Sequence, residues 1–113
     1  MPIRPIQPEH NAVVAAGIRE VYADYGCTGP GFSPTDPEMD FLHKVYSQPG
    51  LGYFVWEDAG AVLGGCGFGP HGPAEESVCE LRKLYLLPAA RGCGAGEKLM
   101  LHTLEQAREQ GYR

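Results

Sequence analysis

The residues of this chain best suited to chemistry are an arginine and three glycines, Arg91, Gly92, Gly94 and Gly96, which follow an apolar run ending at Pro88. Glycines let main-chain N–H groups approach a ligand closely, and a helix beginning there would add the positive end of its dipole. Such a group of donors binds an anion without help from a metal. The segment therefore predicts a phosphate-binding loop, in which Arg91 adds a charge-assisted contact.

Two better-known phosphate loops do not match this segment. A P-loop requires a second glycine five residues after the first, followed by lysine, but Glu97 occupies that position after Gly92. A dinucleotide-binding loop requires the pattern Gly-x-Gly-x-x-Gly, and the third glycine here, Gly96, comes one residue early. Both classes of nucleotide-binding protein are therefore excluded.

The pattern that remains, Arg91-x-x-Gly94-x-Gly96 directly after a strand, resembles the acetyl-CoA pyrophosphate signature of the GNAT N-acetyltransferase superfamily. Residues 80–86 resemble the central strand of that family, and residues 97–110 resemble its cofactor helix. The resemblance implies acetyl-CoA, or a related acyl-CoA, as the cofactor.

The resemblance also implies which residues contact that cofactor. The backbone of residues 84–86 would hold the pantetheine arm, and the glycine-rich loop would hold the pyrophosphate. The expected contacts are Leu84, Tyr85, Leu86, Arg91, Gly92, Cys93, Gly94, Ala95 and Gly96. The alternative, a glycine-rich turn required only for tight packing between a strand and a helix, stays open.

Family members usually continue through a further strand, helix and strand, whereas this sequence stops at Arg113. We therefore expect a single, partial domain over residues 1–113. The expected activity is transfer of an acetyl group to a primary amine of a small molecule or protein by direct attack. The alternative is a non-catalytic acyl-CoA-binding or assembly module.

Direct attack requires an amine that has lost its proton, so a base is needed. Glu80 is the candidate, because related enzymes often place a carboxylate at this point of the central strand. Strict strand alternation predicts that one face carries Val78, Glu80, Arg82, Leu84 and Leu86 and the other Cys79, Leu81, Lys83 and Tyr85. The alternative role for Glu80 is a structural ion pair with Arg82 or Lys83.

An acceptor would enter between the first two helices and the central hairpin. Aromatic side chains available for its pocket are Tyr25, Phe32, Phe41, Tyr46, Tyr53 and Trp56. Aromatic residues at such spacings more often belong to a core, so the acceptor stays open between a small molecule and a peptide.

The elements that position these residues follow from hydrophobic periodicity and from turn and cap signals. The expected elements are strand 3–6, helix 10–25, a helix starting at the capping box 35–38, strands 52–57, 61–69 and 77–87, and helix 94–110. This order, β-α-α-β-β-β-α, predicts an α+β fold with a largely antiparallel sheet flanked by helices.

Composition limits the other classes of function. The chain has 113 residues, 43% of them hydrophobic, and a net charge of −5 without a basic cluster, so we expect neither a nucleic-acid nor a membrane partner. It lacks a long apolar run, so we expect a cytoplasmic protein. Its four cysteines are widely spaced, so no metal site is expected. An exposed sheet edge would favour a homodimer.

Overall fold

The computed structural model describes residues 3–24, 39, 41–58, 60–70, 77–90 and 94–112. Its strands are β1 (Ile3–Pro5), β2 (Gly52–Asp58), β3 (Ala61–Pro70) and β4 (Cys79–Leu86). Its α-helices are α1 (Asn11–Asp24), α2 (Leu42–Tyr46) and α3 (Ala95–Glu109), with short 3-10 turns at Pro8–His10 and Pro88–Ala90. This element order confirms the predicted α+β fold.

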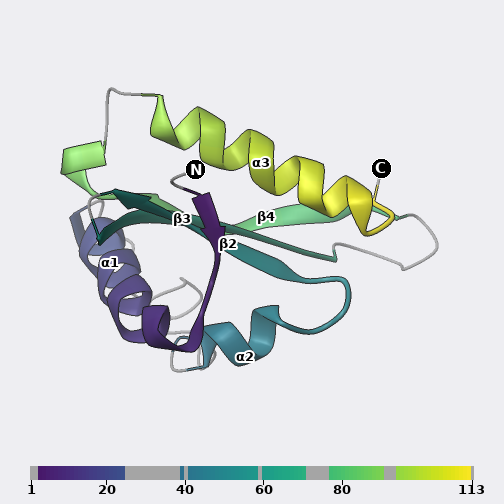
Figure 1. The fold of residues 1–113 in the computed structure, drawn as a ribbon, viewed down its shortest axis with the longest axis horizontal. Helices are drawn as coiled ribbons and strands as arrows, with labels where there is room; N and C mark the ends of the chain where they lie inside the picture. The colour runs from purple at the N-terminus through teal and green to yellow at the C-terminus, as the bar shows by residue number, and fades with distance from the viewer. Residues whose placement is uncertain are drawn as a thin grey trace.

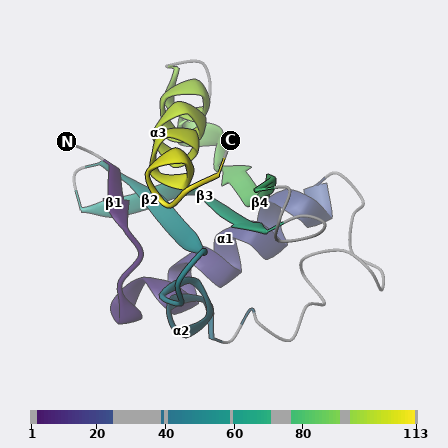
Figure 2. The same ribbon diagram turned by 90° about the vertical axis from the view of Figure 1, so that its right-hand side faces the viewer.

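In the described part of the chain, the four strands form one antiparallel sheet in the order β1-β2-β3-β4. Helix α3 covers one face of the sheet, and α1 and α2 lie on the other (Figure 1). Figure 2, turned by 90°, shows the same three layers, with the sheet between α3 and the other two helices. β1 is an edge strand, as the proline at its end requires, because Pro5 has no N–H to donate to a second neighbour.

The β2–β3 hairpin matches its prediction closely. Its turn passes through Gly60, whose φ of 83° lies in the left-handed region that glycine adopts without steric cost. Alternation along β2 then sends Tyr53 and Val55 to one face and Phe54 to the other. The hairpin therefore supplies side chains to both hydrophobic layers of the molecule.

Each face of the sheet has its own buried core. Toward α1 and α2 the buried residues include Val14, Ile18, Leu42, Tyr53, Val55 and Tyr85. Toward α3 they are Phe54, Cys66, Phe68, Leu99 and Ala107. Each large apolar side chain that is fully buried contributes about 1.5–3 kcal/mol, so both layers are needed to hold the sheet.

The second helix is shorter than the sequence predicted. Its expected start at residues 35–38 lies outside the described residues, but Met39 belongs to a 3-10 turn and Phe41 has non-helical angles, φ −136° and ψ 33°. The α-helix therefore begins only at Leu42, and a helix running continuously from the capping box is wrong. It ends at Tyr46.

The other two helices agree with their predictions to within a residue or two. α1 begins at Asn11 because the residues before it form the 3-10 turn. Within the described ranges, no helix is both long and apolar enough to cross a bilayer. Among those residues, too, no three metal-ligating side chains come together.

Candidate cofactor and acyl-transfer site

The start of α3 presents main-chain donors that the helix itself does not use. Gly94 caps this end with φ 80°, and a side chain at this position would meet no atom within 4 Å, so glycine is needed for its conformation alone. The first intrahelical bond runs from the Lys98 N–H to the Gly94 carbonyl at 3.1 Å. The N–H groups of Ala95, Gly96 and Glu97 therefore precede the hydrogen-bond ladder and can bind an anion.

Gly96 serves a different purpose from Gly94. A Cβ atom at Gly96 would lie 2.8 Å from Cδ1 of Leu86, so the missing side chain lets the first turn of α3 pack directly on the end of β4. The packing explanation left open by the sequence therefore holds for this glycine. The expected contacts at Arg91, Gly92 and Cys93 lie outside the described residues.

β4 carries a bulge next to this helix start. The register pairs Tyr85 with Gly65 and Arg82 with Gly67, so two residues of β4 lie opposite a single residue of β3. Lys83, the first of the two, has φ 51°, which is uncommon for a residue with a side chain. The bulge therefore interrupts β4 within the segment expected to bind pantetheine.

The bulge makes the prediction of strict alternation along β4 wrong. Leu81 packs in the α3 layer, whereas Tyr85, four residues later, is buried in the α1 layer against Gly17. Leu84, the second bulge residue, is 40% exposed and has no partner in the ladder with β3. Its main chain is therefore accessible at the outer edge of the described sheet, where an extended ligand could lie alongside β4.

Glu80 takes part in the ion pair that the sequence offered as an alternative to catalysis. Nε of Arg82 donates to Oε1 of Glu80 at 3.0 Å, and Nη2 of Arg82 donates to the Pro70 carbonyl at 2.9 Å. Burial alone would lower the pKa of the guanidinium, but Tyr46 and Glu80 outweigh it and raise that pKa above its usual value. The Glu80 side chain remains 44% exposed, so a ligand could still reach its carboxylate.

The expected aromatic pocket is assembled only in part. Tyr46 and Tyr53 pack with ring centroids 5.4 Å apart on the side of α1 and α2. Phe41 is exposed, and Trp56 packs in the α3 layer on the opposite face. Tyr25 and Phe32 lie outside the described residues. The core alternative that the sequence left open therefore holds for Tyr46, Tyr53 and Trp56.

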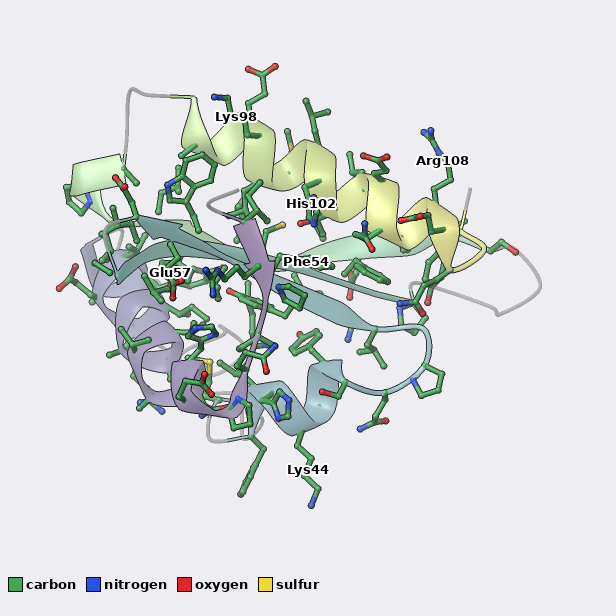
Figure 3. The ribbon with its side chains drawn as sticks, in the orientation of Figure 1. Lys44, Phe54, Glu57, Lys98, His102 and Arg108 are labelled. Carbon is green, nitrogen blue, oxygen red and sulfur yellow. The ribbon has the colours of Figure 1, made fainter. Side chains whose placement is uncertain are left out.

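Figure 3 shows how α3 lies on the sheet beside this site. The His102 ring meets the Phe54 ring edge-on, with centroids 4.8 Å apart, while Lys98 and Arg108 point away from the sheet. His102 therefore packs against the sheet, whereas these two charged side chains of α3 face outward.

Two cavities in the described part of the chain lie away from these residues. One, of about 220 Å³, lies between the start of β4 and the end of α3 and includes Val78 and Tyr112. The other, of about 580 Å³, is lined by residues that include Arg4, His10 and Glu57. Neither of these two cavities is lined by a predicted site residue.

Neither the bulge in β4 nor the side chain that contacts it was predicted from the sequence. The hydroxyl of Tyr53, on β2, donates to the Lys83 carbonyl at 2.7 Å. The available signal was the unusual density of glycine in β3, which includes Gly64, Gly65 and Gly67. Glycine inside a strand often marks a bulge or a close approach of another group.

Comparison with known proteins identifies the class to which this fold and site belong. Residues 18–113 match the family described as "Acetyltransferase (GNAT) family". Over 112 residues the chain is 46% identical to the protein named "Uncharacterized N-acetyltransferase YjgM" of Escherichia coli (strain K12), a match covering 98% of this chain and 67% of that protein. The chain belongs to the GNAT acetyltransferase family and spans about two thirds of that relative's length.

Solved structures of the family have the same fold. A GNAT acetyltransferase from Staphylococcus aureus Mu50 superposes with a TM-score of 0.80 at 14% identity, over 96% of this chain and 66% of that one. A GNAT acetyltransferase from Brucella melitensis, solved in complex with acetyl-CoA, gives a TM-score of 0.75 at 26% identity, over 98% and 70% of the two chains. The expected resemblance to this family is therefore confirmed.

Proposed function

We propose that this protein is an N-acetyltransferase that moves an acetyl group from acetyl-CoA to a primary amine. The observation that carries the proposal is the position of the β4 bulge beside the glycine-capped start of α3. The bulge lies on the outer strand of the described sheet, where an extended ligand could lie alongside β4, and the helix start offers N–H donors to an anion. An acyl-CoA carries both parts, a pantetheine arm and a pyrophosphate.

The residues that would hold the cofactor fall into two groups. The N–H groups of Ala95 and Gly96 would bind pyrophosphate oxygens, together with the loop contacts predicted at Arg91, Gly92 and Cys93. Gly94 would shape that loop, and the main chain of Leu84, Tyr85 and Leu86 would align the pantetheine arm. When bound, acetyl-CoA supplies the acetyl group as an activated thioester.

Glu80 is proposed as the base for the acceptor. Its carboxylate would take a proton from the acceptor's ammonium group, directly or through water, which frees the nitrogen lone pair for attack on the thioester carbonyl. The carbon–sulfur bond would then break, the acetyl group would remain on the nitrogen, and CoA would leave as its thiolate. The proton that the nitrogen loses as the amide forms would reach that thiolate through solvent. Arg82, bonded to Glu80 at 3.0 Å, would keep the carboxylate oriented between cycles.

The acceptor is proposed to be a small-molecule amine or a peptide amine that approaches β4 from the side of α1 and α2. The Glu80 carboxylate is 44% exposed there and can accept a hydrogen bond from an ammonium group. This carboxylate supports an amine as the acceptor. We also propose a cytoplasmic location, supported by the absence of a disulfide between Cys66 and Cys79 within the described part.

Binding and turnover test the proposal separately. Acetyl-CoA titrated into the chain in a calorimeter should bind at one site, and release of free CoA should then follow addition of amines from a panel. Binding without turnover on any amine would favour the alternative, an acyl-CoA-binding module. Absence of binding would overturn both. Size-exclusion chromatography with light scattering tests the expected homodimer.

A further inference from the structure

We propose that Tyr53 is a positioning residue for acyl-CoA, because it maintains the β4 bulge from a position two strands away. The inference rests on the proposed function, because it states that Tyr53 maintains the shape of the β4 edge proposed to bind pantetheine. Tyr53 itself would not contact the ligand. Tyr53 lies on β2, and β3 separates it from the bulge.

The ring of Tyr53 crosses β3 over two glycines. Tyr53 is paired with Gly67 in the β2–β3 register, and a Cβ atom at Gly67 would lie 2.5 Å from its Cδ2. A Cβ atom at Gly65 would lie 2.6 Å from both Cε1 and the hydroxyl oxygen. Any side chain at either position would displace the ring. The two glycines therefore leave the space in which the Tyr53 ring extends across β3 to β4.

The hydroxyl group of Tyr53 ends at the bulge of β4. Gly65 and Gly67 pair with Tyr85 and Arg82, the residues of β4 that flank the two bulge residues. The Tyr53 hydroxyl donates to the carbonyl of Lys83, between them, at 2.7 Å. The two glycines therefore lie at the register positions that let the hydroxyl reach the bulge.

The hydrogen bond stabilises a backbone conformation that a regular strand would not adopt. Lys83 has φ 51° and lies in the register shift between Arg82 and Tyr85. Its buried carbonyl accepts the hydrogen bond from Tyr53, whose side chain is only 2% exposed. Burial raises the pKa of the Tyr53 hydroxyl well above its usual value, so the hydroxyl keeps its proton and remains a donor.

Loss of this donor would favour the regular strand that the sequence pattern predicts. In that strand Lys83 and Leu84 would alternate and pair with β3, and the free main chain at Leu84 would disappear. The affinity for acyl-CoA would then fall, although no contact to the cofactor had been removed. A purely structural role for Tyr53, as a core ring, predicts no such loss.

Tyr53→Phe tests the inference, because it keeps the ring and removes only the hydroxyl. We expect the dissociation constant for acetyl-CoA to rise about tenfold, the scale of one buried hydrogen bond, with kcat at saturation nearly unchanged. The matched control is Tyr112→Phe, which removes a similar bond, from the Tyr112 hydroxyl to the Gly50 carbonyl at 2.8 Å in the α3 layer. The control should leave the dissociation constant within twofold.

A second readout needs no cofactor. Amide hydrogen exchange of the free chain should show altered protection at residues 83–85 in Tyr53→Phe and unchanged protection there in Tyr112→Phe. Replacing Tyr53 with 4-aminophenylalanine, which retains a donor at the ring end, should restore both the exchange pattern and the affinity.

The outcomes separate this inference from the proposed function. If the unaltered chain does not bind acetyl-CoA, the proposed function and the inference resting on it both fail, and exchange still shows whether Tyr53 maintains the bulge. If the unaltered chain binds but Tyr53→Phe binds equally well, or keeps its exchange pattern, only the inference fails. A Tyr53→Phe chain that is unfolded at 25 °C would also overturn it, because the hydroxyl would then support the whole core.

Discussion

The guanidinium of Arg82 donates to the carboxylate of Glu80 over 3.0 Å, two positions along the same strand. Both side chains lie on the same side of β4, before the bulge. Arg82 also donates to the Pro70 carbonyl, and its guanidinium packs against Gly69, where a Cβ atom would lie 2.5 Å from Cζ of Arg82. The pair therefore has a fixed orientation on the face proposed to receive the acceptor.

Glu80→Gln should lower kcat/KM for the amine by about 100-fold or more, because the amide cannot accept the acceptor's proton. The free energy of unfolding should change by less than about 1 kcal/mol, since the lost ion pair is largely exposed to solvent. Steady-state release of CoA and urea denaturation measure the two effects. Glu105→Gln, on the exposed side of α3, is the control, and equal activity of the two variants would refute a base at Glu80.

Gly94→Asp and Gly94→Asn should differ in acetyl-CoA affinity although their side chains are nearly identical in shape. Asn and Asp both tolerate the left-handed conformation at this cap, and neither would clash, because no atom lies within 4 Å of the added Cβ. Only Asp adds a negative charge beside the proposed pyrophosphate site. Calorimetry should show about tenfold weaker binding for Asp than for Asn at low salt, with the difference shrinking as salt is added.

Equal affinities for these two variants at low salt would argue against an anion at the start of α3. Thermal unfolding without ligand serves as the control, because the two variants should then have similar melting temperatures.

Gly96→Ala should destabilise the chain by about 1–3 kcal/mol, since the new methyl group would overlap the Leu86 side chain. Adding Leu86→Ala should recover part of the loss, because it removes the atom that is 2.8 Å from the new Cβ. A double-mutant cycle by urea denaturation measures this coupling. Strictly additive effects would show that α3 does not pack on β4 through this pair.

Cys66 should resist alkylation in the folded chain at pH 9. Burial raises the pKa of its thiol to about 11, so little thiolate forms there, whereas half-buried Cys79 is open to reagent. Iodoacetamide followed by peptide mass mapping distinguishes the two cysteines. Rapid modification of Cys66 in the native chain would contradict its placement under α3.

The same thiol makes folding stability depend on pH. The folded state holds this proton more tightly than the unfolded state, so stability from Cys66 is complete below its unfolded pKa near 9 and is lost as pH rises toward 11. Urea denaturation at pH 8, 9 and 10 should show a steeper decline in the unaltered chain than in Cys66→Ala. Identical declines would contradict a buried, neutral thiol.

Much of the fold was readable from the sequence because local signals and burial agree. The hairpin combines two alternating apolar strands with a turn glycine, and α3 combines an amphipathic stripe with the glycine at its cap. The short length of α2 was not predicted. A capping box indicates where a helix can begin, but it does not determine the backbone angles of Phe41, which are non-helical.

The bulge in β4 was beyond sequence reasoning for a physical reason. We infer that its register depends on the hydrogen bond between Tyr53 and Lys83, which are 30 positions apart in the sequence. Hydrophobic periodicity reports only on residues that are close together in the sequence. The need for glycine at the start of α3 was predictable because these glycines act locally, Gly94 through its own φ and Gly96 through one contact with Leu86. Side-chain alternation, applied without the bulge, therefore failed only downstream of Lys83.

The proposed site places acyl-CoA along the bulged edge of β4, with its pyrophosphate at the start of α3. An NMR titration of the isotopically labelled chain with acetyl-CoA locates the ligand residue by residue. We expect the largest amide shift changes at residues 84–86 and 94–97. Changes confined to the cavity around Arg4, His10 and Glu57, or no changes at all, would contradict it.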